Sequence, residues 1–333
     1  MRRLAALTVT LLAACATPAS AAMTLGGWDK ADQHASDVQG LMHVLEDGAF
    51  HGDHLLTGAQ LRQSRDALAT RLGVAPVNLG ALGSRVSVAS FDRALVLQLG
   101  LGDVAAAIQR QARFRGLNPP ARFGTEVVAR ALGLRFNHPF PLGEKLELYP
   151  WDAITRAEAA YSFARIAQFG DGDVQWVRGT FSRFTLPRYT AAQRAALRIA
   201  VSKIGMPYIW GGETDGASAG QVHGGYDCSG LAWRVFKLSG LPAGRKIGGR
   251  SAAQQAGEIP RSQRLRLNQI HPGDLLFFGP GRFWQKATEA RIVHEGIALS
   301  SDFAIHSSAQ GVYVLPLDQG WLHDEFVWGR RVL

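Results

Sequence analysis

Cysteine is scarce in this sequence, with only Cys15 and Cys228 among 333 residues. Two thiols cannot form a disulfide framework, and neither belongs to a CxxC pair of the kind that binds zinc. Long apolar runs are also missing beyond the N-terminus, so no other segment approaches the length of a transmembrane helix. A hydrophobic content of 47% is ordinary for a globular protein, and a chain of this length can form two or three domains.

Acidic residues are outnumbered, 27 against 36 Lys and Arg, which gives a net charge of +9. This balance suits an anionic partner such as nucleic acid, a membrane surface or an acidic wall polymer. The N-terminus decides among these partners. A basic start at residues 1–3, an apolar run over Leu4–Leu12 and an A-x-A site at residues 19–21 predict a signal peptide over 1–22. We therefore expect an exported protein, in the cell wall or extracellular, with no nucleic-acid partner.

A second interpretation overlaps the first. The run Leu12-Ala13-Ala14-Cys15 resembles a bacterial lipoprotein box, in which Cys15 would carry a lipid anchor. Both interpretations place the mature protein outside the cytoplasm. If cleavage falls near Ala21, Cys228 is the only thiol left, and a lone thiol in an exported protein is a candidate reactive group.

Residues 23–188 are predicted to form a helical region in which one design recurs. Segments beginning near residues 55, 86 and 153 each have a short extended lead-in, a Ser or Thr N-cap and an amphipathic helix ending near a glycine. In the third, Thr155 and Glu158 predict a capping box and Gly170 the helix end. Repetition of this kind predicts small helical units that bury their apolar faces on one another.

The third segment, Ile154-Thr155-Arg156-Ala157-Glu158-Ala159, resembles the S-layer homology modules that anchor bacterial proteins to the wall. The first two segments depart from that motif, because Gly58 and Ala89 stand where it carries Arg or a similar residue. The resemblance implies that 23–188 binds an anionic secondary wall polymer. The alternative is a plain helical domain that positions the domain at 189–333, with residues 171–188 as the linker.

The second domain is organised around Cys228. Asp227 is a natural N-cap, so the thiol is expected in the first turn of a helix that stops at Gly240. Free N–H groups and the helix dipole there favour a thiolate, although a lone cysteine can also be a buried structural residue. Apolar strands follow, and helices before consecutive strands predict an α+β domain with an antiparallel sheet. The predicted strands are 275–278, 291–299, 303–307, 311–315 and 326–332.

Two histidines lie in neighbouring predicted strands. His294 shares a face with Gly296, and small neighbours leave room for a helix terminus to approach. If residues 300–302 form a three-residue turn, Gly296 pairs with His306, and the two imidazoles lie on one face, ~7–8 Å apart at Cα. A two-residue turn would separate them. A thiol, a base and a residue that orients the base are what a cysteine peptidase needs.

Residues 190–333 resemble the NlpC family of bacterial cell-wall cysteine peptidases, which have a papain-like fold. Ordered motifs carry this resemblance: Pro207-Tyr208-Ile209-Trp210-Gly211-Gly212, Asp227-Cys228-Ser229-Gly230-Leu231, Pro272-Gly273-Asp274-Leu275, His294-Glu295-Gly296-Ile297 and Ile305-His306. The resemblance implies that Cys228 is the nucleophile, His294 the base and His306 its orienting residue. It also implies that Tyr208 is the active-site tyrosine, and that Asp227 and Ser229 contact substrate.

The implied reaction is hydrolysis of an amide bond in peptidoglycan stem peptides, in many members the bond between D-glutamate and a diamino acid, without a metal or cofactor. An N-acetylmuramoyl-L-alanine amidase, an acyl transferase and a non-catalytic wall-anchoring protein are the alternatives. Two features depart from the family pattern: the loop 213–226 is long, and Glu295 stands where an apolar residue is usual.

Overall fold

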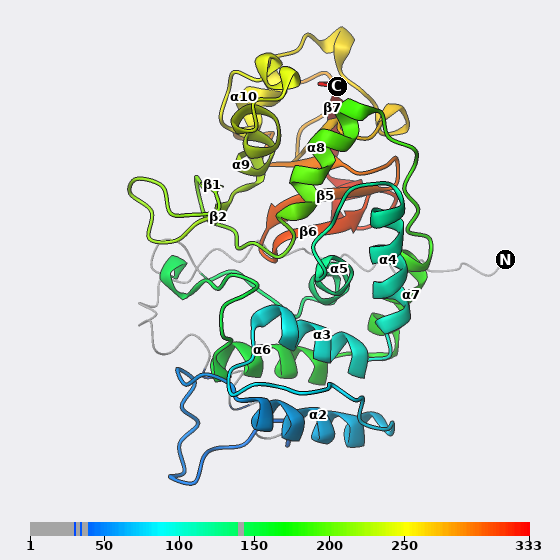
Figure 1. Ribbon diagram of the computed structural model, residues 1–333. Helices are drawn as coiled ribbons and strands as arrows, with labels where there is room; N and C mark the ends of the chain where they lie inside the picture. Colours follow the sequence, from blue (N-terminus) through cyan, green and yellow to red (C-terminus); the bar gives the residue numbers. More distant parts are fainter. Residues whose placement is uncertain (1–29, 31–33, 35–38, 139–142) are drawn as a thin grey trace, which may run out of the picture.

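The computed structural model describes residues 30, 34, 39–138 and 143–333, so the predicted signal peptide at 1–22 and the lipidation site at Cys15 lie outside the described residues. A helical N-terminal region is followed by a domain built on an antiparallel sheet, as predicted for an α+β protein (Figure 1). No helix within the described ranges has both the length and the apolar character required to cross a membrane.

The N-terminal region contains α2 (Gly58–Leu72), α3 (Val88–Gln98), α4 (Gly102–Phe114), α5 (Phe123–Ala131), η1 (Glu144–Leu146), α6 (Arg156–Ala167) and α7 (Asp171–Ser182). Helices α2, α3 and α6 are the three predicted units. Their extended lead-ins lie side by side, because the N–H of Leu56 donates to Ile154 O and the N–H of Ile154 donates to Val86 O, both at 2.9 Å. The prediction that these units pack on one another is confirmed.

Two local predictions in this region are wrong. The predicted linker 171–188 contains helix α7, whose first turn is held by Asp173 accepting the N–H of Gly170, and whose Val177 and Phe181 are buried. Glycines 172 and 179 interrupt the apolar spacing and hide it. The second wrong prediction is the end of α6, which lies at Ala167 and not at Gly170.

The predicted capping box of α6 forms only in part. Thr155 Oγ1 accepts the N–H of Glu158, as an N-cap should. The Glu158 carboxylate does not return the bond, because it is paired with Arg135 and lies 3.0 Å from His138. A complete capping box, by contrast, forms between Thr190 and Gln193 at the start of α8 (Ala191–Ser202).

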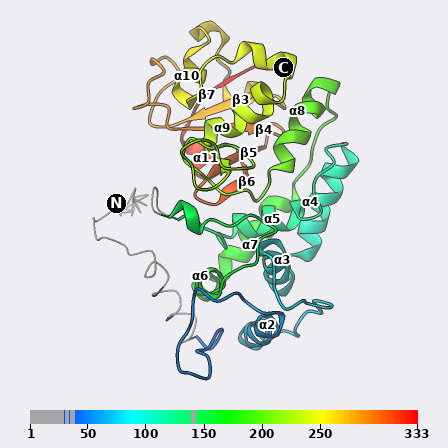
Figure 2. The ribbon, with the colours of Figure 1, turned by 60° about the vertical axis from the view of Figure 1, so that its left-hand side comes forward.

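The C-terminal domain contains α8 (Ala191–Ser202), β1 (Glu213–Thr214), β2 (Gly225–Tyr226), α9 (Cys228–Ala232), the π-helical turn η2 (Trp233–Leu238), η3 (Pro242–Lys246), α10 (Ala252–Gly257), η4 (Arg261–Gln263), η5 (Leu267–Gln269), β3 (Leu275–Phe278), β4 (His294–Ala298), β5 (Phe303–Ser308), β6 (Gly311–Pro316), α11 (Trp321–Asp324) and β7 (Phe326–Arg330). Strands β3 to β7 form one antiparallel sheet in the order β6-β5-β4-β3-β7 (Figure 2).

The predicted register between β4 and β5 is confirmed, because Gly296 pairs with His306. Strand β4 is shorter than predicted and begins at His294, which is therefore its first residue and not its middle. The sheet meets the helical region at the edge strand β6, against which α5 packs (Figures 1 and 2).

The two faces of the sheet belong to different cores. One face carries Ile297 and Phe277 and packs in the main core with Leu231 of α9. The other face carries Phe278 and Ala298 and packs in a smaller core beside α11. Because side chains alternate along a strand, each residue of β4 is committed to one of these cores.

Candidate active site

Cys228 is the first residue of α9, where the sequence predicted it. The Asp227 carboxylate caps this helix by accepting the N–H of Gly230 at 2.5 Å. The regular helix lasts five residues and continues as a π-helical turn to Leu238. Cys228 as a whole residue is half-buried, neither enclosed in the core nor fully exposed.

The surroundings of Cys228 favour the neutral thiol. Burial raises the pKa of Cys228 to about 12, and the carboxylates of Asp227 and, where it is ionised, Glu295 act in the same direction. The nearby backbone N–H groups of Glu295 and Ser229 lower the pKa, but by less. The predicted thiolate at the helix terminus is therefore wrong for the free protein, because desolvation outweighs the dipole of so short a helix.

The two predicted histidines are in direct contact. His294 Nε2 lies 3.0 Å from His306 Nδ1, and the two rings are nearly perpendicular. Burial lowers the pKa of His294 to about 3 and the pKa of His306 well below its usual value, so both imidazoles are neutral at neutral pH. Trp321 packs against both rings, with centroid distances of 5.1 and 5.4 Å. No pattern in the sequence pointed to Trp321, which comes after β4 and β5 in the chain.

The thiol and the histidine pair meet the start of β4 from different faces of the sheet. His294 and His306 belong to the face of Phe278, whereas α9 covers the face of Glu295. The paired residues of β4 and β5 begin at Gly296, and the backbone N–H of Glu295 lies close enough to the sulfur of Cys228 to lower its pKa. The sulfur thus lies near the peptide that follows His294, and the described residues show no hydrogen bond between the thiol and either imidazole.

This arrangement differs from the prediction in one respect. Gly296 was expected to make room for the helix that carries the thiol. The structure uses that room for the second imidazole, since a Cβ on Gly296 would lie 3.2 Å from the Cβ of His306.

A groove of about 590 Å³ opens beside the thiol, a volume within the range of small-molecule sites. Its lining includes Tyr208, Trp210, Cys228, Arg250, Glu289 and Val293. Burial raises the pKa of the Tyr208 hydroxyl, and the negative charge of a Cys228 thiolate would raise it further, so this phenol is a neutral donor. Tyr208 and Cys228, both predicted to belong to the active site, thus line the same groove.

Arg250 holds the wall that carries Asp227 and Ser229. Its guanidinium donates to Asp227 Oδ1 at 3.1 Å and to Ser229 Oγ at 3.0 Å, and its Nε donates to Glu213 at 2.7 Å. The predicted substrate contacts Asp227 and Ser229 are therefore engaged within the protein. Sequence reasoning missed Arg250. Its only signal was an arginine in a glycine-rich loop just before the N-cap Ser251.

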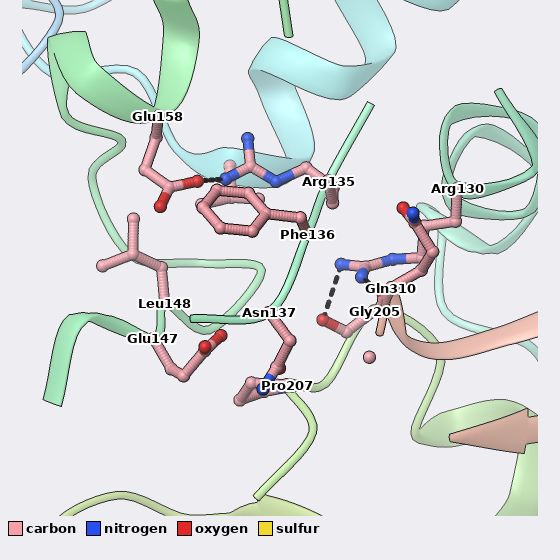
Figure 3. Close-up of a pocket in the computed structure, with 12 residues that line it drawn as sticks. Arg130, Arg135, Phe136, Asn137, Glu147, Leu148, Glu158, Gly205, Pro207 and Gln310 are labelled. Carbon is pink, nitrogen blue, oxygen red and sulfur yellow. Dashed lines mark hydrogen bonds and ion pairs between the residues drawn. The ribbon is translucent and has the colours of Figure 1, made fainter. Parts of the chain in front are cut away.

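A second cavity lies between the helical region and the sheet (Figure 3). It is lined by charged groups, among them Arg130, Arg135 and Glu158, and its volume is about 20 Å³. That volume holds a single water molecule. This cavity belongs to the junction of the two regions and not to a substrate site.

Residues 205–331 match the NlpC/P60 family. The probable endopeptidase Rv2190c of Mycobacterium tuberculosis H37Rv is 31% identical over 126 residues, which are 37% of this chain and 26% of the relative. The peptidoglycan endopeptidase RipB of the same strain is 34% identical over 103 residues, 29% of this chain and 39% of the relative. The gamma-D-glutamyl-L-lysine dipeptidyl-peptidase of Bacillus cereus is 27% identical over 168 residues, 49% of this chain and 44% of the relative. The chain thus spans less than half of the length of these curated relatives.

Proposed function

We propose that the NlpC/P60 domain of this chain is a peptidoglycan hydrolase, a cysteine endopeptidase that cuts an amide bond in the stem peptide. Two observations support this most: the contact between His294 and His306, and a thiol that opens into a groove. The relatives named as endopeptidases support the same reaction class. The name of the Bacillus cereus relative favours a bond on the γ-carboxyl of D-glutamate, and we propose the bond from D-glutamate to a diamino acid.

The proposed reaction begins with transfer of the thiol proton from Cys228 to Nδ1 of His294. For Nδ1 to accept it, His294 must carry its own proton on Nε2, which then donates to Nδ1 of His306. The sulfur attacks the carbonyl carbon, the C–N bond breaks, and His294 returns the proton to the leaving amine. Water then attacks the thioester, and its proton passes through His294 back to the sulfur.

The resting state of this pair is neutral, because the thiol has a raised pKa and the imidazole a lowered one. We therefore propose that the proton moves when the substrate is bound, and not beforehand. Tyr208 and the backbone N–H of Cys228 would donate to the oxyanion, and loss of one such donor typically costs ~3–4 kcal/mol. Asp227 and Ser229 shape the groove through Arg250.

We further propose that the protein is exported and works at the cell wall, with or without a lipid on Cys15. The signal-like N-terminus and the net charge of +9 support this location. The helical region, with its likeness to S-layer homology modules, would bind an anionic wall polymer. In a binding assay on purified wall, we expect this attachment to weaken as salt rises.

Digestion of muropeptides, analysed by mass, tests the reaction. Wild type should release fragments cut within the stem peptide, and Cys228→Ala and His294→Ala should each lower the rate by at least ~10³. His323→Ala, at an exposed histidine, should keep wild-type activity. Melting curves should show that all three variants fold.

The fragment masses distinguish the alternatives. Release of the intact stem peptide would identify an N-acetylmuramoyl-L-alanine amidase. If fresh wall yields no fragment while the protein still binds it, the endopeptidase proposal is wrong and the chain is a wall-anchoring protein.

A further inference from the structure

Two histidines and an aspartate come together in the loop that precedes α2, far from the catalytic groove (Figure 1, blue loop). His51, Asp53 and His54 each offer one ligand atom, and these atoms lie within 4.8 Å of one another. The two imidazoles stack with their centroids 4.4 Å apart. We propose that this His51 cluster, defined as these three residues, binds a divalent transition-metal ion.

Zinc fits the donor set best among common metal ions. Imidazole nitrogen and carboxylate oxygen are ligands that Zn²⁺ takes in proteins, in tetrahedral sites with four ligands. The His51 cluster supplies three donors, so a water molecule would fill the fourth position. Hard cations such as Mg²⁺ and Ca²⁺ prefer sets of oxygen ligands, and the two imidazoles disfavour them.

The loop is fixed in place before any ion arrives. Arg156, at the start of α6, is buried, and its side chain donates to Phe50 O at 2.9 Å and to His43 O at 2.6 Å. The backbone N–H of Arg156 donates to His54 O at 2.8 Å. Three hydrogen bonds from one residue therefore hold the loop before the cluster and at its last residue. A preformed loop lowers the entropy cost of binding an ion.

Asp47 is the second feature that indicates a metal ligand. Its carboxylate lies 2.5 Å from Nε2 of His51, so it can accept a hydrogen bond from that nitrogen. This contact favours the tautomer in which Nδ1 of His51 carries the free lone pair. Ligating histidines in metal sites nearly always donate their other nitrogen to such a carboxylate or carbonyl.

His51 also has an unusual backbone. Its φ of +52° is in the left-handed region, which residues other than glycine rarely adopt. Such a conformation persists only where the surroundings impose it, and here it directs the ring onto that of His54. The strain, the orienting carboxylate and the fixed loop all concern the same three donors.

The test is calorimetric titration of the full chain, without an affinity tag, with zinc sulfate alone. We expect one ion per chain in the wild type and at least a tenfold loss of affinity in His54→Ala. Asp47→Asn keeps all three donors but removes the orienting carboxylate, and it should weaken binding by ~10–100-fold. His323→Ala is the matched control, because His323 is an exposed histidine beside the carboxylate of Asp324, and it should bind like wild type.

A free thiol is itself a zinc ligand, so each variant is also measured in a Cys228→Ala background. Binding that survives Cys228→Ala but is lost in His54→Ala supports the proposal. Equal binding by His54→Ala and His323→Ala, or no binding by the wild type, would overturn it. Asp53→Asn, with circular dichroism as the folding check, keeps the test decisive if His54→Ala does not fold. Both readouts are independent of whether the chain cuts peptidoglycan.

Discussion

At the scale of single residues, Glu295 is the least ordinary side chain of the candidate active site. Its carboxyl group is fully buried in β4, and neither oxygen has a hydrogen-bond partner among the described residues. Burial raises the pKa of Glu295 well above its ordinary value, and the charge of Asp227 raises it further, against the opposing effect of Arg330. The carboxyl group of Glu295 is therefore buried without a hydrogen-bond partner, which lowers the free energy of unfolding by ~1–3 kcal/mol.

We predict that Glu295→Val stabilises the protein more at pH 8 than at pH 5. The folded wild type keeps a proton that the unfolded chain releases near pH 4.5, so its stability falls by ~1.4 kcal/mol per pH unit until the folded pKa is reached. Valine cannot ionise and lacks this slope. Urea unfolding at the two pH values measures the difference, with Glu46→Val, at an exposed position, as control. A gain in stability that is the same at both pH values would contradict a protonated Glu295 in the folded protein.

The sequence predicted some of these residues and not others for a physical reason. Cys228, His294 and His306 each lie in a local pattern, either a helix start or a strand with a short turn. Arg250 was missed because its partners lie 21 to 39 positions away, and only the folded chain brings them together. The direction of the Cys228 pKa was missed because burial is a property of packing and not of a helix terminus.

At the scale of elements, the start of α9 depends on one arginine. Arg250 joins Glu213 in β1, the carbonyls before β1 and the Asp227 cap into one network. The network fixes the direction in which α9 leaves the loop, and thus the place of the thiol. Among the described residues Cys228 is a free cysteine, so this hydrogen-bond network and not a disulfide holds the segments together.

We predict that Arg250→Ala lowers the free energy of unfolding by ~2–3 kcal/mol and the muropeptide rate by more than tenfold. Its loss leaves the buried cap Asp227 without its cation, and charged hydrogen bonds contribute ~1.5–3 kcal/mol each. Arg250→Lys keeps the charge but not the planar fork and should be intermediate. Arg282→Ala, at an exposed arginine, should change both quantities little. Wild-type activity in Arg250→Ala would show that the network does not position the thiol.

Strands were easier to predict than helices in this chain. A side-chain period of two and a three-residue turn fix the register of β4 and β5, which the structure confirms. Helix α7 was mistaken for a linker, because its glycines break the apolar spacing that identifies a helix. The π-helical turn after α9 has no counterpart in sequence periodicity.

At the scale of the whole molecule, buried charge links the helical region to the sheet. Arg130 of α5 donates to Glu126 at 2.9 Å and to Gly205 O at 2.8 Å, and it also bonds Gln310 O in the turn between β5 and β6 (Figure 3). Gly205 stands three residues before Tyr208, so this contact connects the helical region to the wall of the groove. The helical region therefore helps to position the candidate active site.

We predict that Arg130→Ala destabilises the protein by ~3–5 kcal/mol, because Glu126 is fully buried and would lose its partner. Arg178→Ala breaks a comparable pair with Asp103 at 2.7 Å, but that pair is exposed and should matter by less than ~1 kcal/mol. Urea unfolding, followed by both tryptophan fluorescence and helix content, compares the two. Wild type should unfold in one transition, and Arg130→Ala should separate the two probes, because the contact that couples the regions is gone. Equal losses in the two variants would mean that the regions fold independently and that the junction does not position the groove.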